Sequence, residues 1–580
     1  MTYRWVLRPV NDPDAVTTIQ QQLNQLPQAL ARALVLRGID TFEAARHYFR
    51  PSLDALHDPF LMQDMDDAAD RVARAVQQGE RVLVYGDYDV DGTTSATVMT
   101  HFLRSMGVEA GFFIPNRFEH GYGLHTDGID HAVEQDARLI ITLDCGITAL
   151  DEARYAREKG IDLIICDHHT ATDATPDAVA VLDPKRPTCP YPFKELSGCG
   201  VTFKLVQATL KRLGEPAERA LPYLDLVAIS TASDIVPLHG ENRVLMREGF
   251  KQLRQTQRLG LRTLAEHAGL NFDGLSVDRI VFGIGPRINA AGRTGEADRA
   301  VQLLLSDDPA EAADLARVLE KANQQRKALD RETQKQAIRQ AEIQLAGKMR
   351  HALVLYEPHW HQGVIGIVAS RLVERFHRPA VMLCTANGEV KGSARSITGV
   401  NIYEALKACE DLLTQFGGHD YAAGMTLSEE NIPAFRDRLD EAVGAVMTPE
   451  MMVPAIEVDA LLNLDALNDR FWNVLKQFAP FGPTNMKPIF HARDLQAVGQ
   501  PRAVGVGGDH LKLAVRQQNN DGGRPHPVIA FGHGEKLPLV QAAQREDRPL
   551  EMLFSVEENT WQGQTSIQLR ARDLRVQEEW

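Results

Sequence analysis

Short apolar runs rich in β-branched residues alternate with helical patterns between residues 80 and 185, and this alternation is the strongest constraint on the fold. The segments between the runs, such as 94–106 and 148–159, have the apolar spacing of helices. Strands separated by helices of about 10 to 15 residues form βαβ units, which build a parallel sheet. Ligands bind such sheets beyond the carboxyl ends of the strands. The predicted strands cover residues 82–85, 111–114, 139–143, 162–166 and 179–182.

The composition is that of a globular protein with several domains. At about 150 residues per domain, 580 residues predict roughly three to four domains. Hydrophobic residues make up 44% and charged residues 24%, which excludes a wholly disordered, collagen-like or coiled-coil chain. With 63 Lys and Arg against 78 Asp and Glu, the net charge of −15 argues against coating nucleic acid or a membrane by bulk charge. A polyanion would have to be bound through local basic patches or metal ions.

The sequence shows no signal for secretion or membrane insertion. No run approaches the roughly 18 apolar residues of a membrane span, and the N-terminus has no apolar signal core, so we expect a cytoplasmic protein without membrane contact. The 6 cysteines include no CxxC pair, which favours reduced thiols over disulfides or a zinc ribbon.

A long helix is predicted to follow the first α/β region. Asp308-Pro309-Ala310-Glu311 combines an N-cap, a proline at the first helical position and a capping-box glutamate. Neither Gly nor Pro occurs again before Gly347, so the helix would reach roughly 55 Å at 1.5 Å per residue. Its middle, 323–336, is polar except for Ala328 and Leu329, and we expect it to bridge two domains through solvent. Two helices joined by a bend are the alternative.

The remaining chain predicts two further domains. Runs at 352–356 and 380–384 and a helix near 363–376 indicate a second, smaller α/β domain. Short alternating runs with many Gly and Pro residues then indicate a small β-barrel or sandwich. We therefore expect an N-terminal segment (1–45), a first α/β domain (46–305), a connecting helix (306–348), a second α/β domain (349–450) and a barrel domain (451–580).

Acidic residues and histidines follow several of the predicted strands. In a parallel sheet they converge on one edge, where so many carboxylates would repel each other unless cations neutralised them. Oxygen and imidazole ligands without a thiolate predict Mn²⁺ or Mg²⁺, and histidine favours Mn²⁺. For any single aspartate, an N-cap role is the alternative. The residues are Asp87, Asp89 and Asp91 after the first strand, Asp144 after the third, Asp167, His168 and His169 after the fourth, and Asp234 after an apolar run at 224–229.

These four motifs resemble, in order and spacing, those of the DHH phosphoesterase family, which is named after the triplet seen here as Asp167-His168-His169. The resemblance implies that one or two Mn²⁺ or Mg²⁺ ions are held by Asp89, Asp91, Asp144, His168 and Asp234. Many family members carry a histidine where this chain has Tyr85, and Asp87 is the nearest substitute ligand. The resemblance further implies catalytic roles for Asp144, Asp167 and His169.

The reaction implied by such a metal pair is phosphoester hydrolysis by an activated water. The sequence contains neither a GxSxG elbow nor a GxxxxGK[ST] phosphate loop, which are the signatures of other hydrolases and of nucleotide triphosphate binding.

Two arginine-bearing runs indicate the kind of phosphoester. Pro-Arg-Ile-Asn-Ala-Ala-Gly-Arg at 286–293 and Pro-Asn-Arg-Phe-Glu-His-Gly-Tyr-Gly-Leu at 115–124 resemble signatures of single-strand-specific exonucleases of this family. The resemblance implies that a terminal 5′ phosphate contacts Arg117, Arg287, Asn289 and Arg293. A solvated basic face is the alternative for the run at 286–293, and Tyr122 either stacks on a base or fills a turn.

The second α/β domain carries runs that resemble the phosphate-binding loops of the DHH-associated domain. They contain Ser393, Arg395 and His419, which would touch nucleic acid opposite the metal site. By the same resemblance the C-terminal region is an oligonucleotide-binding (OB) barrel.

The resemblance as a whole implies a 5′→3′ exonuclease that degrades single-stranded DNA in recombination and repair. A helicase and a single-strand-binding protein are partners implied by the family alone. Two alternatives remain. A phosphodiesterase for short oligonucleotides or cyclic dinucleotides would need neither the barrel nor the arginine runs. A non-catalytic replication scaffold should have lost metal ligands, which are all present here.

Overall fold

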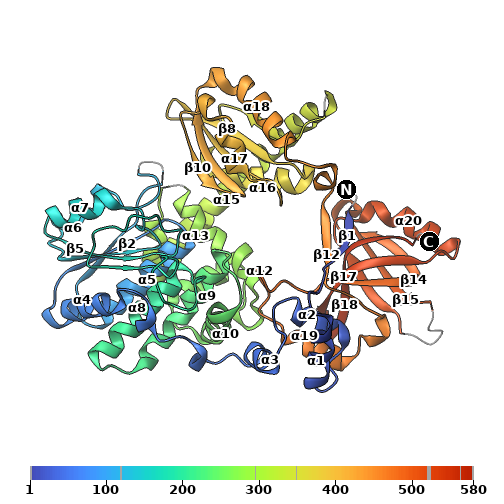
Figure 1. Cartoon of the computed structure of the whole chain (residues 1–580), viewed down its shortest axis with the longest axis horizontal. Helices are drawn as coiled ribbons and strands as arrows, with labels where there is room; N and C mark the ends of the chain where they lie inside the picture. The colour runs from blue at the N-terminus through green and yellow to red at the C-terminus, as the bar shows by residue number, and fades with distance from the viewer. Residues whose placement is uncertain are drawn as a thin grey trace.

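The computed structural model describes residues 3–117, 120–293, 295–347, 349–518, 524–561 and 564–577. Figure 1 shows three folded bodies: a large α/β domain in blue and green, a smaller α/β domain in yellow and orange, and a red C-terminal barrel against which the blue N-terminal helices lie. Within the described part of the chain, none of the helices combines the length and apolar character that crossing a lipid bilayer requires.

The large domain contains a five-stranded parallel sheet, as the alternation of strands and helices predicts. Its strand order is β3-β2-β4-β5-β6, and all neighbours pair in parallel. Both faces are covered by helices, which explains why β2 and β4 are buried throughout and apolar in sequence. The strands are β2 (Val82–Gly86), β3 (Ala110–Phe113), β4 (Leu139–Leu143), β5 (Asp162–Cys166) and β6 (Ala180–Leu182).

Helices from both sides pack on this sheet. One face carries α4 (Met65–Gln78), α5 (Val90–Ser105) and α8 (Gly198–Leu213), and the other face carries α6 (Thr126–Glu134) and α7 (Leu150–Glu158). A helical layer continues the first face. Its members are α9 (Leu224–Ser233), α10 (Gly240–Gln255), α11 (Leu259–His267), α12 (Val277–Arg279), the π-helical turn η5 (Ile280–Ile284), α13 (Gly285–Gly292) and α14 (Asp298–Leu305).

The connecting helix α15 (Pro309–Gly347) is unbroken over 39 residues, and Asp308 caps it by accepting the backbone N–H groups of Ala310 and Glu311 at 2.8 and 2.9 Å. Its first half packs on α11, α13 and α14, and its second half on α16 (Gln362–Phe376). The expectation of a solvated middle needs correction. Asp330 is buried and accepts a hydrogen bond from Arg371 of α16 at 2.8 Å, so the polar residues there face a polar partner.

The second α/β domain has a mixed five-stranded sheet in the order β10-β11-β9-β8-β7. Only β7 and β8 pair in parallel, and the other neighbours among these described strands are antiparallel. Its elements are β7 (Leu353–Tyr356), β8 (Ala380–Ala386), β9 (Glu389–Arg395), β10 (Gln415–His419), β11 (Ala422–Leu427), α16, α17 (Ile402–Lys407) and α18 (Ile432–Gly444).

The C-terminal strands form the predicted barrel. Five strands follow one another in the order β14-β15-β16-β18-β17, and a further pairing between β14 and β17 closes the barrel. Closure removes the free sheet edges. The strands are β14 (Phe490–Val504), β15 (His510–Gln517), β16 (His526–Ala530), β17 (Leu550–Trp561) and β18 (Gln564–Val576), with β13 (Ala460–Leu461) beside β14 and helices α19 (Asp469–Lys476) and α20 (Leu537–Arg545) alongside.

The N-terminal segment packs on this barrel rather than standing alone. β1 (Arg4–Leu7) pairs in parallel with β12 (Ala455–Val458). The helices α1 (Pro13–Gln22), α2 (Gln28–Val35) and α3 (Phe42–Phe49) share one hydrophobic core with the barrel. Arg243 of α10 joins the large α/β domain to this body: its guanidinium lies 3.8 Å from the centre of the Tyr48 ring and donates to the carbonyl oxygen of Phe478 at 3.0 Å.

Candidate active site

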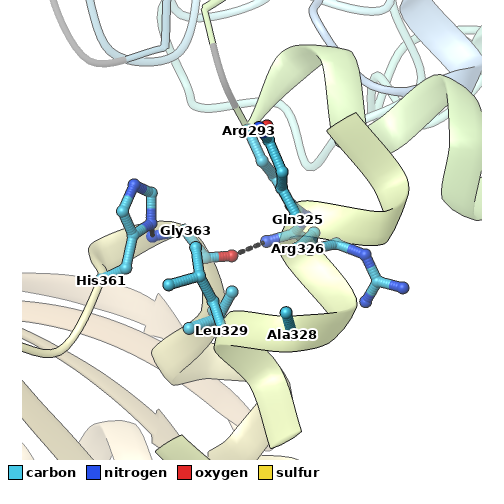
Figure 2. Close-up of a pocket in the computed structure, with 8 residues that line it drawn as sticks. Arg293, Gln325, Arg326, Ala328, Leu329, His361 and Gly363 are labelled. Carbon is cyan, nitrogen blue, oxygen red and sulfur yellow. Dashed lines mark hydrogen bonds between the residues drawn. The ribbon is translucent and has the colours of Figure 1, made fainter. Parts of the chain in front are cut away.

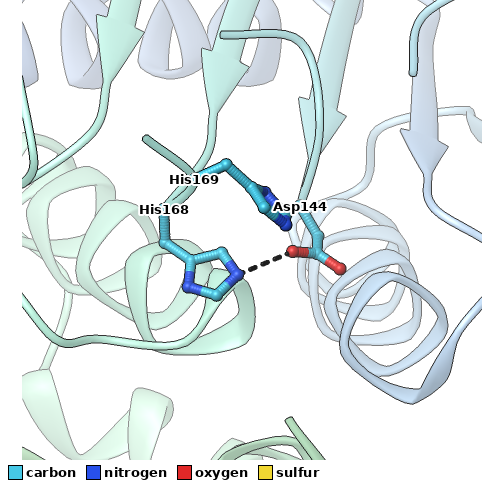
Figure 3. Close-up of side chains that lie close together, drawn as sticks. All are labelled: Asp144, His168 and His169. Atoms are coloured by element: carbon cyan, nitrogen blue, oxygen red, sulfur yellow. Dashed lines mark ion pairs between the residues drawn. The ribbon is translucent and has the colours of Figure 1, made fainter. Parts of the chain in front are cut away.

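Strand register brings the acidic motifs to one level of the sheet edge. Gly86 pairs with Leu143, and Leu143 pairs with Cys166. The residues that follow each strand are therefore neighbours, and Asp234 joins them from the C-terminal end of α9, which packs on α5. Among the residues that the structure describes, three sets of side chains have ligand atoms within 4.8 Å of one another: Asp144, His168 and His169; Asp91, His168 and Asp234; and Asp87, Asp89 and Asp144. In Figure 3 the His168 ring faces the Asp144 carboxylate.

Asp91 is fixed by the N-terminus of α8. Its carboxylate accepts the backbone N–H groups of Gly198 and Cys199 and the Ser230 hydroxyl, each at 2.7 Å. A helix N-terminus favours a negative charge in this position. A Cβ on Gly198 would lie 2.8 Å from Cβ of Asp144, so only glycine lets the helix end approach so closely.

His168 lies between three carboxylates. Its Nε2 atom is 3.1 Å from Oδ1 of Asp144, 3.6 Å from Oδ2 of Asp234 and 3.7 Å from Oδ2 of Asp91. Burial lowers the pKa of His168 and outweighs the attraction of Asp91, so the ring favours its neutral form. A neutral imidazole is the form that coordinates metal ions.

Several of these buried atoms lack a hydrogen bond within the described residues, namely Oδ1 of Asp87, Oδ1 of Asp144, Oδ2 of Asp234 and both ring nitrogens of His168. Burial, followed by the neighbouring carboxylates, raises the pKa of Asp144 well above its usual range. Buried polar groups are ordinarily paired, and bound divalent cations pair with this combination of oxygen and imidazole donors. The residues present therefore fit Mn²⁺ or Mg²⁺.

Tyr85 points away from this cluster. Its buried ring stacks on Phe113 with centroids 5.4 Å apart, and its hydroxyl donates to the carbonyl oxygen of Gly123 at 2.9 Å. Asp87 has an oxygen without a partner among the described residues, beside Asp89 and Asp144, and is the better placed of the two candidates for the position.

Asp167 is saturated by protein hydrogen bonds. Its Oδ1 accepts the backbone N–H groups of His168 and His169 at 2.8 and 3.2 Å and Nδ1 of His169 at 2.7 Å, and its Oδ2 accepts the N–H of Ile147 at 2.9 Å. Burial alone would raise the pKa of Asp167, but the contact with His169 outweighs it and lowers that pKa. The expected catalytic contact is therefore revised to a positioning role.

His169 is held by two groups. Asp167 raises the pKa of His169 even though burial opposes this. The hydroxyl of Tyr122 lies 3.0 Å from Nδ1 of His169 and donates to the carbonyl oxygen of Asp144 at 3.2 Å. Tyr122 thus belongs to the site, in a role that its sequence context did not indicate.

A cavity of about 280 Å³ adjoins the carboxylates and brings three of the expected phosphate-binding residues to them. The Arg117 guanidinium lies 5.1 Å from the Tyr88 ring centre, and Oδ1 of Asn289 accepts the backbone N–H of Val90 at 3.1 Å. Phe118, Glu119 and Thr294, which belong to or follow the signature runs, lie outside the described residues. The cavity is lined by Asp87, Tyr88, Asp89, Arg117, Tyr122, Asn289, Gly292 and Arg293.

Arg287 lies elsewhere, which corrects its expected phosphate contact. It is 7% exposed, and its Nε atom forms a 2.6 Å ion pair with Glu320 of α15. A second nitrogen donates to the carbonyl oxygen of Gly283 at 2.7 Å. These bonds occupy the Arg287 guanidinium and join α13 to α15.

The second α/β domain contributes basic charge from across the junction. Arg395 donates to the Ser393 hydroxyl at 3.0 Å, and burial followed by the charge of Arg117 lowers the pKa of Arg395. Burial, followed by Arg117, Arg326 and Arg395, lowers the pKa of Arg293 to about 10. His419 is exposed at the end of β10, where its backbone pairs with Ala422. Ser393, Arg395 and His419 were all expected to lie opposite the metal site. The geometry agrees with this expectation better for Ser393 and Arg395 than for His419.

Asp183 is an acidic residue of this edge that the motifs did not include. Leu182 of β6 pairs with Cys166 of β5, so Asp183 follows at the level of Asp167. Its side chain is buried, one oxygen accepts the backbone N–H of Lys185 at 2.7 Å, and burial foremost raises the pKa of Asp183 to about 7. The strand-end rule that found the other aspartates would have found this one.

Three family models match this chain: the DHH family, N-terminal domain at residues 81–231, the DHHA1 domain at 350–445 and the RecJ OB domain at 458–573. Each match falls inside one of the domains expected from the sequence. The single-stranded-DNA-specific exonuclease RecJ of Bacillus subtilis is 39% identical over 579 residues, covering 99% of this chain and 71% of that protein. The protein of the same name from Salmonella typhimurium is 34% identical over 567 residues, covering 95% and 96%.

Solved structures show the same fold. The crystal structure of RecJ in complex with Mn²⁺ from Thermus thermophilus matches with a TM-score of 0.84 and 31% identity, covering 100% of this chain and 80% of that chain. The corresponding complex with Mg²⁺ gives a TM-score of 0.78 and 30% identity, covering 100% and 79%. The expected fold class is thereby confirmed, from the parallel-sheet domain through the connecting helix to the barrel.

Proposed function

Because this chain belongs to the family of single-stranded-DNA-specific exonucleases named RecJ, we propose that it hydrolyses single-stranded DNA from the 5′ end with bound Mn²⁺ or Mg²⁺. The observation that carries the proposal is the pairing of two features at one sheet edge. Buried oxygen and imidazole atoms without partners among the described residues lie beside a cavity lined by Arg117 and Arg293. A metal centre next to a cavity lined by arginines suits cleavage close to a phosphorylated end.

The cations would be held by the unpaired oxygens of Asp87, Asp144 and Asp234, by Asp89 and Asp91, and by His168. When bound, such ions lower the pKa of water and offset the negative charge that develops on the phosphoryl oxygens. Asp91 is kept rigid by the N-terminus of α8, so its position changes little between the free and loaded site.

We assign the role of proton donor in this reaction to His169. Asp167 accepts Nδ1–H of His169 and raises the pKa of that ring, so His169 can carry a proton to the leaving 3′ oxygen. Asp167 acts through His169 alone, since its own oxygens are occupied.

The positions of the arginines support the proposed polarity. Arg117, Arg293 and Arg395 would hold the terminal 5′ phosphate while the next phosphodiester reaches the metal residues. The barrel would hold the strand further on, as OB folds do through cations and stacking aromatics. An enzyme for cyclic dinucleotides would need neither these arginines nor the barrel. A non-catalytic scaffold would not need the unpaired ligand atoms.

An exonuclease specific for single-stranded DNA needs unpaired strands during recombination and repair. A helicase and a single-strand-binding protein are the partners that would provide them. A DNA substrate also supports the expectation of a cytoplasmic location.

The test is degradation of a long oligonucleotide labelled at either end, with and without Mn²⁺, by the full-length protein. We expect Mn²⁺-dependent loss of the 5′ label as mononucleotide before the 3′ label, and duplex DNA of the same sequence should resist. Prior release of the 3′ label would refute the polarity. Turnover that survives chelation, or turnover of a cyclic dinucleotide alone, would refute the function.

A further inference from the structure

A second cavity, of about 440 Å³, shares Arg293 with the one beside the carboxylates, and its other lining residues have no part in the reaction described above. It lies where α13, α15 and the start of α16 meet (Figure 2). The lining residues are Arg293, Gln325, Arg326, Ala328, Leu329, His361, Gly363 and Val364.

The apolar part of the cavity includes two residues from the polar middle of α15. Ala328 and Leu329 are the only apolar residues in the polar middle of α15, and both line this cavity together with Val364 of α16. Leu329 is 44% exposed, so it faces open space rather than a packed neighbour. Ala328 is exposed as well, so these two residues of α15 give the cavity an apolar side of the kind that holds ring systems in ligand pockets.

The charged part of the cavity is short of anions. Arg293 donates to the carbonyl oxygen of Gly363 at 2.5 Å, and Arg326 lies 3.7 Å from Asp330, its nearest described carboxylate. The Nε atom of Arg326 is buried and has no hydrogen-bond partner among the described residues. Because neighbouring guanidinium groups repel one another in a buried setting, a bound anion would stabilise them.

We propose that this cavity binds a nucleoside 5′-monophosphate, with the nucleoside against Ala328 and Leu329 and the phosphate against Arg293 and Arg326. The inference rests on the proposed function, because such a nucleotide is the product that an exonuclease releases. The volume of about 440 Å³ lies within the range of small-molecule sites. Since Arg293 also lines the cavity beside the carboxylates, a nucleotide held here competes with the 5′ phosphate of the next strand.

The first experiment measures binding to the full-length protein in EDTA, with 2′-deoxyadenosine 5′-monophosphate (dAMP) and inorganic phosphate as probes. Burying the nucleoside against apolar walls should make dAMP bind at least about tenfold more tightly than phosphate. Leu329→Trp fills the cavity and should abolish this difference while leaving phosphate binding intact. Equal affinities of the wild-type protein for dAMP and phosphate would overturn the proposal.

A matched control is available on the same helix. Ile343 of α15 is 67% exposed and lies outside the cavity, so Ile343→Trp should bind dAMP as the wild type does and keep its exonuclease activity. Should Leu329→Trp fail to fold, Leu329→Ala removes the apolar wall from an exposed position and should weaken dAMP binding about fivefold. Unchanged dAMP affinity in Leu329→Ala contradicts the proposal.

The second experiment measures inhibition. We expect dAMP to raise KM for a 5′-phosphorylated strand without lowering kcat, and Leu329→Trp to relieve this inhibition. Exonuclease activity without dAMP binding would remove the inference and leave the function standing. Conversely, dAMP binding by a protein that cleaves no DNA would remove the proposed function and leave the nucleotide site.

Discussion

Arg287 of α13 and Glu320 of α15 form a 2.6 Å ion pair that ties the catalytic domain to the connecting helix. Arg293, six residues further along, lines the cavity beside the carboxylates instead. One sequence run thus carries an arginine that joins two helices and another that lines the cavity beside the carboxylates.

The two kinds of arginine should respond differently to substitution. Arg117→Ala should raise KM for 5′-phosphorylated ends by tenfold or more relative to 5′-hydroxyl ends, because a charge-assisted phosphate contact is lost, an effect of about 1.5 to 3 kcal/mol. Arg287→Ala should leave that ratio unchanged and lower stability by about 1 to 3 kcal/mol, because the half-buried Glu320 loses its charged partner. Steady-state kinetics on both ends, with thermal unfolding, separate the two. A changed end preference in Arg287→Ala would contradict our assignment.

Metal binding should be visible as a gain in stability. Mn²⁺ at 100 times its Kd stabilises a folded protein by about 2.7 kcal/mol, so the EDTA-treated protein should unfold at higher temperature when Mn²⁺ is added. Asp144→Ala should lose both this shift and cleavage without unfolding, because it removes an unpaired ligand oxygen. Asp151→Ala, which alters an exposed aspartate on α7, is the control and should behave as the wild type. A full Mn²⁺ shift in Asp144→Ala would exclude Asp144 as a ligand.

Gly198→Ala should impair the site without touching a ligand. Its Cβ would lie 2.8 Å from Cβ of Asp144 and push the N-terminus of α8 away from Asp91. We expect at least tenfold slower cleavage, about 1.4 kcal/mol, and a weaker Mn²⁺ affinity. Gly347→Ala, where an added Cβ meets nothing within 4 Å, is the matched substitution, and normal activity in Gly198→Ala would show that the close approach is dispensable.

Asp183 should make the metal-free protein less stable as pH rises. Burial raises the pKa of its carboxyl from 3.8 to about 7, so between these values the folded state holds a proton that the unfolded state has released. Stability therefore falls as pH increases from about 4 to about 7 and then levels off. Asp183→Asn should flatten this profile and raise stability at pH 8 by about 1 to 4 kcal/mol. Unfolding measured in EDTA across this range provides the check, and an unaltered slope in Asp183→Asn would assign it to another group.

The sequence predicts what depends on local pattern and on the geometry of parallel sheets. Asp87, Asp144 and Asp167 could be brought together in advance because each directly follows a strand, and equal strand register does the rest. The helix from Asp308 to Gly347 was predictable for a similar reason, since its cap and its uninterrupted course are both local.

Features that depend on distant partners were not predictable. The sequence around Arg287 does not indicate that its ion-pair partner is Glu320, which is 33 residues away on another helix. The solvated middle expected for α15 failed because Arg371, a residue of the next domain, supplies the partner of Asp330. The pairing of β1 with β12 joins residues about 450 positions apart, which no periodicity reveals.

The packing of the N-terminal helices on the barrel has a consequence for biosynthesis. The apolar faces of α1, α2 and α3 leave the ribosome early, whereas the barrel strands that cover them are translated after residue 489. At roughly 5 to 20 residues per second, these helices stay uncovered for tens of seconds. These helices are thus made well before the barrel strands that cover their apolar faces, and they complete their packing only when those strands have been translated.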